Sequence, residues 1–129
     1  MIIDSSAILA ILFGEPDAKL FSDAISGAPR CRMLTANWFE VAMNVDAPGD
    51  AWASRRLDEF IETARIELLP FTETYALRAR HAWLQFGRGR HKARLNFGDC
   101  MAYSAAKVEG EKLLYKGNDF AQTDIDSAL

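Results

Sequence analysis

Asp99 is the acidic residue whose surroundings most need a chemical explanation. It follows Gly98, which is expected to break the preceding segment, and it precedes a run of good helix formers that is apolar most of the way round, Cys100–Val108. This pattern predicts that Asp99 lies in the first turn of a buried helix, where the helix dipole favours a carboxylate. Capping the helix is its ordinary role there. A carboxylate taken out of water also needs a cation, a metal or several donors, or it takes up a proton.

Two further acids occupy comparable positions. Asp4 ends the apolar segment Met1–Ile3, which is expected to be a strand, and the serines after it can cap an apolar helix. Because ligands of open α/β sheets bind outside the carboxyl ends of the strands, Asp4 is a candidate site residue as well as a cap. Glu40 lies in a narrow polar strip of an otherwise apolar helix, and a solvated position explains it equally well when it is taken alone.

A fourth polar position follows the last expected strand. Asn118 and Asp119 stand in the turn after it, and a turn residue is the ordinary role of such a pair after glycine. Asp4, Asp99 and this turn would nevertheless meet at one edge of a sheet, and Glu40 would join them from a flanking helix. A purely structural sequence does not need such a convergence, so we predict a functional site there.

The elements that must position these residues alternate along the chain. Apolar runs favour strands, and the amphipathic or apolar segments between them favour helices. The expected strands are Met1–Ile3, Cys31–Leu34, Ile66–Leu69 and Lys112–Tyr115. This alternation predicts an α/β fold in three layers, with a parallel sheet of four to five short strands flanked by helices on both faces. The helix after Thr72 is expected to carry one apolar stripe: Tyr75, Ala79, Ala82, Trp83 and Phe86.

Composition limits the class of protein. The chain has 129 residues, of which 50% are hydrophobic and 11% aromatic, which predicts one domain over residues 1–129 with a substantial core. Met1–Ile3 lacks the basic start of a signal peptide, and no apolar stretch approaches the roughly 20 residues of a membrane span, so we expect a cytoplasmic protein without membrane association. Cys31 and Cys100 suit buried thiols better than a disulfide framework or a zinc site.

Charge is distributed unevenly. The formal net charge is −3, yet Thr74–Gly98 contains no acid and six of the 15 Lys and Arg residues. Four of them lie in a glycine-interleaved segment just before Asp99: Arg88, Arg90, Lys92 and Arg94. A solvated loop is the ordinary interpretation of such a run. A flexible basic loop also suits RNA, because guanidinium groups can reach successive phosphates of a nucleic-acid backbone.

Four motifs, in this order and at this spacing, resemble the PIN domain, and specifically the VapC toxins of bacterial toxin–antitoxin pairs. They are Ile3–Ala7, Glu40 within a helix, Leu95–Cys100 and Leu113–Phe120. The resemblance covers essentially the whole chain. It implies a metal-dependent endoribonuclease, commonly a homodimer, which a small VapB-like antitoxin holds inactive in a heterotetramer or larger assembly with its tail over the active site.

The resemblance also implies roles for individual residues. Asp4, Glu40 and Asp99 match the three core acids of the family, and Ser6 matches the small hydroxyl residue beside the first acid. Many relatives have aspartate where this chain has Asn118. The neighbouring Asp119 is the candidate to supply that fourth charge, which leaves the number of bound metals open.

The chemistry of the acids agrees with these roles. Clustered carboxylates without His or Cys are hard oxygen ligands, so they favour Mg²⁺ or Mn²⁺ over zinc, and the cation offsets their mutual repulsion. Such a metal lowers the pKa of a water molecule and stabilises the charge that develops on phosphorus during in-line attack. Asp4 and Asp99 are the expected direct ligands, whereas Glu40 and Asp119 bind metal or orient the water.

Two other classes of function fit parts of the sequence. One is a phosphatase with an Asp nucleophile at the end of the first strand, although such enzymes usually have a second acid two residues later, where this chain has Ser6. The other is a non-catalytic nucleic-acid-binding module in which the acids only cap helices. Metal-dependent RNA cleavage separates the nuclease from this module, and a covalent acyl-phosphate would identify the phosphatase.

The sequence carries more apolar helix surface than one small sheet can cover. The segments Ile8–Phe13 and Trp38–Val45 are apolar on more than one face, and Trp52, Phe60 and Ile61 add large side chains to the helix that follows. Because monomeric proteins rarely expose a large contiguous apolar patch, we expect part of this surface to form a homodimer and part to form a groove for a helix of the antitoxin.

Overall fold

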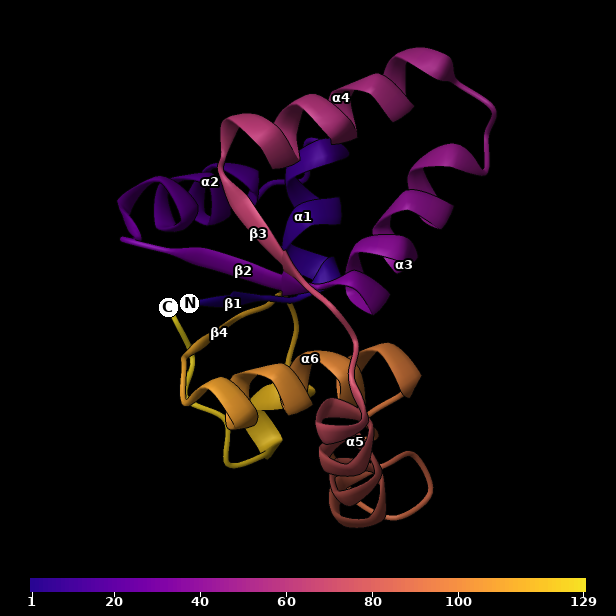
Figure 1. Ribbon diagram of the computed structural model, residues 1–129, viewed down its shortest axis with the longest axis vertical. Coiled ribbons are helices and arrows are strands. Elements are labelled where there is room, and N and C mark those ends of the chain that lie inside the picture. Colours follow the sequence, from indigo (N-terminus) through magenta and orange to yellow (C-terminus); the bar gives the residue numbers. More distant parts are fainter.

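A parallel sheet of four short strands separates the helices of the chain into two layers (Figure 1). The computed structural model describes residues 1–129. Its elements are β1 (Ile2–Ile3), α1 (Ser5–Leu12), α2 (Ala18–Gly27), β2 (Cys31–Leu34), α3 (Thr35–Asp46), α4 (Ala51–Thr63), β3 (Ile66–Leu69), α5 (Glu73–Phe86), α6 (Phe97–Glu109), β4 (Leu113–Leu114) and the 3₁₀ helix η1 (Phe120–Gln122). None of the helices is both long and apolar enough to cross a membrane.

The order of the strands explains where a site can form. The sheet order is β3-β2-β1-β4, and every pairing is parallel. The chain moves outward from β1 through β2 to β3, and then returns to the other side of β1 to form β4. The order therefore reverses at β1, and Asp4 lies at the carboxyl end of that strand, where the Asp4 N–H donates to the Leu114 carbonyl oxygen at 2.9 Å. This is the switch point at which open α/β sheets bind ligands.

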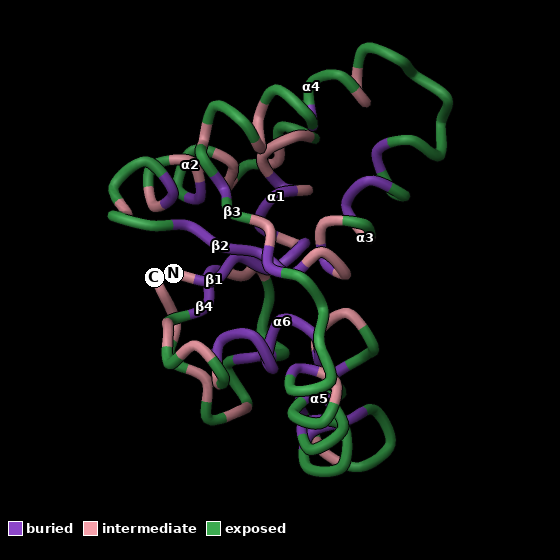
Figure 2. The backbone as a smooth tube through the Cα atoms, in the orientation of Figure 1, coloured by how far each residue is buried: buried purple, intermediate pink, exposed green.

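Helices cover both faces of the sheet, as the alternation of the sequence predicts. Helices α1 to α4 lie on one face, and α5, α6 and η1 lie on the other (Figure 1). Figure 2 shows that the strands and most of α6 are buried, whereas the outer turns of α4 and α5 are exposed. The predicted three-layer α/β fold is confirmed, with four strands in the sheet.

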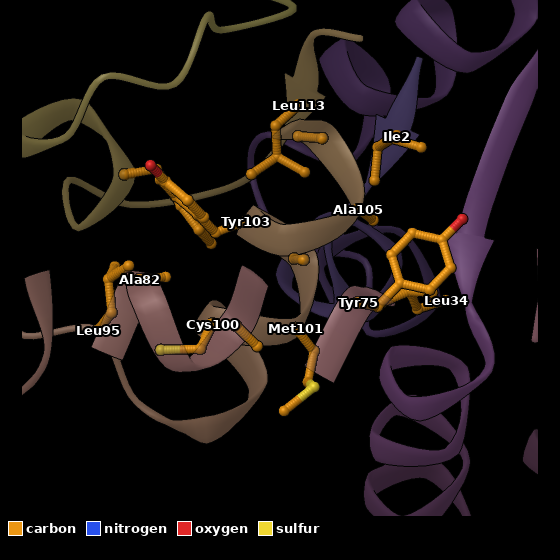
Figure 3. Packing of buried hydrophobic residues seen from close by; sticks show 14 of the residues in the cluster. Ile2, Leu34, Tyr75, Ala82, Leu95, Cys100, Met101, Tyr103, Ala105 and Leu113 are labelled. Carbon is orange, nitrogen blue, oxygen red and sulfur yellow. The ribbon is translucent and has the colours of Figure 1, made fainter. Parts of the chain in front are cut away.

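Each face of the sheet has its own hydrophobic core. The core under α5 and α6 contains Ile2, Leu113, Tyr103 and Ala105, which Figure 3 shows at close range. Every residue of α6 from Cys100 to Ala106 is buried, because this helix packs against the sheet, α5 and the chain after β4. The all-round apolar pattern of the Asp99 helix thus reflects burial on several sides.

One predicted packing position is wrong. Trp83 belongs to the predicted apolar stripe of α5, but its side chain is 39% exposed, while the other members of the stripe are buried. Helical periodicity identifies the apolar face of a helix but not how far the neighbouring elements extend over it. The indole lies at the edge of the contact between α5 and α6, and this contact covers only part of the ring. The predicted strand Lys112–Tyr115 is also shorter, because only Leu113 and Leu114 are assigned to β4.

Candidate active site

Asp4 is a buried carboxylate at the start of α1. Its side chain is the N-cap of that helix, and its Oδ2 accepts hydrogen bonds from the Ser6 amide at 2.9 Å and from the Ser6 hydroxyl at 2.5 Å. The Ser6 hydroxyl oxygen in turn accepts from the Lys116 amide at 3.0 Å, which ties the turn after β4 to the end of β1. Ser6 therefore fixes the orientation of the Asp4 carboxylate. The other oxygen, Asp4 Oδ1, is buried and has no hydrogen-bond partner.

The environment of Asp4 is unfavourable to its negative charge. The pKa of Asp4 is raised to about 7, mainly by burial and also by the negative charges of Asp99 and Glu40, while the Ser6 hydrogen bonds oppose the shift. A carboxylate that is 2% exposed and faces two other acids needs positive charge nearby to remain ionised. The charges of Asp99 and Glu40 both act on Asp4, so the three acids lie near one another.

Asp99 caps the helix that it begins and still faces the other acids. Asn96 and Asp99 form a reciprocal capping box, in which the Asp99 amide donates to Asn96 Oδ1 at 2.9 Å and the Asn96 amide donates to Asp99 Oδ2 at 2.8 Å. Burial raises the pKa of Asp99, and the charges of Asp119 and Glu40 act in the same direction, while the Asn96 amide and Arg88 oppose them. Capping and participation in the site are therefore compatible, because the box engages only one carboxylate oxygen.

The role predicted for Gly98 requires a correction. The helix begins at Phe97, so Gly98 lies inside its first turn and does not break the preceding segment. The reason for glycine is the approach of Glu40: a Cβ added to Gly98 would lie 2.5 Å from Glu40 Oε2. The Ser5 hydroxyl donates to the same oxygen at 2.8 Å, and Asn37 Nδ2 donates to the Gly98 carbonyl oxygen at 3.0 Å. These contacts hold Glu40 of α3 against the first turn of α6.

Replacing Gly98 by alanine is expected to displace the Glu40 carboxylate without unfolding the protein. The new methyl group meets the flexible end of a side chain, and alanine favours the helix, so the free energy of unfolding should change little. A shift of about 1 Å in a catalytic group can cost on the order of 10²-fold in rate, and for the ribonuclease that the resemblance implies we expect a loss of RNA cleavage of that order. The control is Gly27→Ala at the end of α2, where an added Cβ meets nothing within 4 Å. Equal cleavage rates for both variants would show that the position of Glu40 is unimportant.

The turn after β4 carries the two candidates for the fourth acidic position, Asn118 and Asp119. Asn118 and Asp119 are both exposed, and neither side chain makes a hydrogen bond. The charge of Asp119 is nevertheless close enough to raise the pKa of Asp99. We refer to Asp4, Glu40, Asp99 and Asp119 as the acid cluster. Of the two residues, Asp119 is the one whose charge acts on Asp99.

The acid cluster has donors that suit a hard divalent cation. As the side chains are oriented, no three His, Cys, Asp or Glu residues lie close enough together to bind one ion, since Glu40 points to Ser5 and Gly98. Mutual repulsion of like charges favours such a separated arrangement. Asp4 Oδ1 has no hydrogen-bond partner, and the pKa of Asp4 is raised. A positive charge at this position would stabilise the ionised form of Asp4. Carboxylate oxygens without His or Cys are the donors that Mg²⁺ and Mn²⁺ prefer.

The predicted basic segment forms an ordered loop next to the acid cluster. Its base is closed by hydrogen bonds from the Arg88 amide to the Leu95 carbonyl oxygen and from the Leu95 amide to the Phe86 carbonyl oxygen, both at 3.0 Å. His91 packs edge-on against Phe86, with ring centroids 5.1 Å apart. The four basic side chains of this basic loop are exposed: Arg88, Arg90, Lys92 and Arg94. The loop therefore presents a concentrated positive charge from a fixed backbone.

Comparison with known proteins identifies the family. A family model described as "PIN domain" matches residues 1–126. The chain belongs to the PIN domain family. It is 46% identical over 130 residues to "Ribonuclease VapC28" of Mycobacterium tuberculosis, covering 100% of this chain and 98% of that protein. It is 41% identical over 125 residues to "Ribonuclease VapC" of Mycolicibacterium smegmatis, covering 97% of each. This PIN domain is thus a full-length homologue of VapC ribonucleases, as the four motifs predict.

Solved structures agree on the fold. The crystal structure of Mycobacterium tuberculosis VapC20, described as a "Sarcin-Ricin loop cleaving toxin", superposes with a TM-score of 0.77 at 12% identity, covering 96% of this chain and 95% of that one. A toxin–antitoxin complex from Klebsiella pneumoniae contains a chain that superposes with a TM-score of 0.74 at 15% identity, covering 95% and 92%. At these identities the likeness concerns the PIN fold.

Two structural features of the site were not predicted. The capping box has an Asn-x-x-Asp spacing, which is a close variant of the known helix-start pattern and could have located the first turn of α6. Asn37 lies in the polar strip of α3, but its buried position against Gly98 depends on the packing of α3 on α6. No local pattern gives that packing.

Proposed function

We propose that this PIN domain is a metal-dependent endoribonuclease of the VapC type, in which Asp4, Glu40 and Asp99 bind Mg²⁺ or Mn²⁺. The observation that carries the proposal is the buried Asp4 carboxylate, which faces two other acids and has one oxygen without a partner. The naming of full-length relatives as ribonucleases favours this activity over the phosphatase and over the non-catalytic binding module.

Each acid has a role in the proposed reaction. A bound divalent cation would neutralise charge on the scissile phosphate and lower the pKa of a water molecule. Ser6 holds the Asp4 carboxylate through Oδ2, so that Oδ1 remains free for the cation. Asp99 contributes the second direct ligand. Glu40 and Asp119 bind metal or accept a proton from the attacking water.

The activity is tested with purified protein freed from any bound partner. Incubation with a panel of cellular RNAs should give discrete cleavage products in Mg²⁺ or Mn²⁺ and none with excess chelator. Cleavage that persists in chelator would exclude metal dependence. Absence of cleavage under every metal condition, together with a covalent acyl-phosphate on Asp4, would instead identify the phosphatase.

We further propose that the basic loop binds the RNA backbone. Exposed guanidinium and ammonium groups interact with phosphates irrespective of sequence, and releasing counterions makes this binding depend on salt. Changing Arg88, Arg90, Lys92 and Arg94 to alanine should weaken binding of many RNA sequences alike. For single strands the salt slope should fall in magnitude by up to about 3, since each phosphate contact contributes roughly 0.7.

The stability of the loop variant should remain close to that of the wild type, because exposed loop charges contribute little to folding. The control is a double variant of α4, Arg55→Ala with Arg56→Ala. It also removes exposed positive charge, but at positions outside the basic loop. Filter binding or anisotropy over a range of salt concentrations measures both effects. An unchanged salt slope in the loop variant would mean that these side chains are only solvated.

A VapB-like antitoxin is the proposed regulatory partner, and a homodimer is the proposed form of the toxin. Large apolar side chains on the outer faces of α3 and α4 are exposed: Phe39, Met43 and Trp52. A surface of this kind suits a second protomer or an amphipathic helix of a partner. A basic residue on the antitoxin tail could offset the charge of the acid cluster. The RNA substrate and the antitoxin would both be found in the cytoplasm, so we expect the protein to act there.

Native expression and light scattering test the proposed partners. The natively expressed protein should co-purify with a small protein, and expression of the chain alone should arrest growth. Size-exclusion chromatography with light scattering should give a dimer for the isolated chain. A strict monomer at a concentration on the order of tens of micromolar would contradict the homodimer. Recovery of no small protein, with no growth arrest, would contradict the toxin assignment.

A further inference from the structure

An apolar pocket opens between α5 and the first turn of α6, next to the acid cluster. Its volume is about 620 Å³, which is within the usual range for a pocket that holds one small molecule or group. Its walls are mainly hydrophobic, and Cys100 and Met101 of α6 form part of them. The remaining lining includes Asn96, the residue that caps Asp99, so the pocket and the acid cluster share the first turn of α6.

Two aromatic side chains at this pocket are exposed to solvent. Phe97 is 75% exposed and Trp83 is 39% exposed. The indole of Trp83 also packs close to Gly87, where an added Cβ would lie 2.7 Å from the ring. Exposed aromatic faces are suitable for stacking against a flat ring.

The charged residues of the pocket are both arginines. Arg80 and Arg88 line it, no acidic residue does, and the whole segment Thr74–Gly98 contains no acid. Arg88 also lines a shallow depression formed by the basic loop, and its positive charge lowers the pKa of Asp99. Arg88 therefore connects three surfaces: the apolar pocket, the basic loop and the acid cluster. The ligand that complements them is flat and apolar on its faces and carries negative charge at its edge.

We propose that the pocket binds one unpaired nucleobase of the RNA substrate, which stacks against Trp83 or Phe97 while an adjacent phosphate pairs with Arg88. This inference rests on the proposed ribonuclease function and adds a base subsite to it. Because the charge of Arg88 acts on Asp99 and Arg88 also lines the depression of the basic loop, a strand with its scissile phosphate at the acid cluster would pass Arg88 on its way to that loop. An apolar peptide segment would fill the same walls but would leave the positive charge of Arg80 and Arg88 unmatched.

The test compares RNA with a polyanion that has no bases. Binding of fluorescein-labelled single-stranded RNA and of inorganic polyphosphate is measured in excess chelator, so that cleavage does not interfere. Trp83→Ala and Phe97→Ala should each weaken RNA binding by roughly 5-fold to 100-fold, the range for loss of one base–aromatic stack, and leave polyphosphate binding within about twofold. Phe97→Ala is the safer variant for folding because its side chain is the more exposed of the two.

The matched control is Leu77→Ala. Leu77 is 55% exposed on α5, the helix that carries Trp83, but it does not line the pocket. This variant should bind both probes like the wild type. Wild-type RNA affinity in Trp83→Ala and Phe97→Ala would overturn the proposal and assign the pocket to another occupant, such as a peptide. Equal losses on RNA and polyphosphate would also overturn it.

These outcomes are independent of the nuclease assay. If the wild type cleaves RNA in Mg²⁺ while the two aromatic variants bind RNA normally, only the base subsite fails. If the wild type cleaves no RNA but the variants lose RNA affinity selectively, the ribonuclease function fails and the base subsite remains. If the wild type binds no RNA, both fail.

Discussion

Asp4→Asn and Asp99→Asn are each expected to abolish RNA cleavage while the fold remains intact. An amide is almost the same size as the carboxylate but is a poorer ligand for a hard cation, and asparagine is also a good N-cap. Loss of one group that stabilises charge in a transition state commonly costs about 10²-fold to 10³-fold in rate, and loss of a metal ligand should cost at least as much. Initial cleavage rates in Mg²⁺ give the measurement.

The control for charge removal is Asp58→Asn on α4, where the side chain is exposed. Its cleavage rate should match that of the wild type. Wild-type rates in both Asp4→Asn and Asp99→Asn would refute the assignment of the metal site, because these two acids are its proposed direct ligands.

The same variants have a predictable effect on stability in chelator. The pKa of Asp4 is raised to about 7 in the folded protein from an unfolded value of 3.8, so the folded state binds the proton more tightly. The free energy of unfolding should therefore fall as the pH rises from about 4 to about 7, by on the order of 4 kcal/mol from this group. Asp4→Asn removes that dependence and should be more stable than the wild type at pH 8, but not at pH 4.

Urea denaturation of both proteins at these two pH values measures this difference. Asp99 has a pKa shifted in the same direction, so the wild type retains part of its pH dependence when only Asp4 is changed. A stability difference between Asp4→Asn and the wild type that does not vary with pH would show that the buried charge of Asp4 is not the cause.

The sequence predicts the central sheet well because most residues of its strands are buried. Cys31–Leu34 and Ile66–Leu69 are predicted with the observed bounds, since short runs dominated by apolar residues between helices are typical of such strands. The position of Asp4 follows from the same logic. A residue at the end of the first strand lies at the switch point once the fourth strand returns beside it.

The remaining features depend on contacts that no local pattern encodes. Trp83 is apolar and correctly spaced for burial, but α6 does not extend over it, and a pocket results. Glycine at position 98 indicates a break by its type alone, whereas the structure explains it by Glu40, which is 58 positions away in the chain. Arg32 is a third example. Its position in a strand is evident from the sequence, but the local sequence does not identify the acidic residues that pair with it.

Arg32 is a buried cation of β2 whose partners lie at the end of α6. Its guanidinium pairs with Glu109 and Glu111, each at 2.5 Å, and its side chain is almost fully buried. Glu109 also accepts a hydrogen bond from the Tyr75 hydroxyl at 2.6 Å, and Glu111 also pairs with the N-terminal amine of Met1. This network joins the strands to α5 and α6 at the end of the sheet opposite the acid cluster.

Arg32→Met is therefore expected to be the most destabilising of the substitutions considered. The change leaves two partly buried carboxylates without their main cation, and breaking a buried ion pair in this way costs about 3–5 kcal/mol. The pKa values of Glu109 and Glu111 are lowered in the folded protein by Tyr75, by Arg32 and by the N-terminus, so their contribution is present above pH 4.5, the unfolded value, and is lost as the pH falls below it.

Arg30→Met is the matched control, because Arg30 forms an exposed pair with Glu67 at 2.6 Å on the same segment of chain. An exposed pair contributes up to about 1 kcal/mol, so urea denaturation should separate the two variants clearly at pH 7. Combining Arg32→Met with Glu109→Gln and Glu111→Gln should restore part of the lost stability, because the cost comes from unpaired charge and not from the missing side chain. Equal stabilities of the Arg32→Met and Arg30→Met proteins would mean that this network does not hold α6 to the sheet.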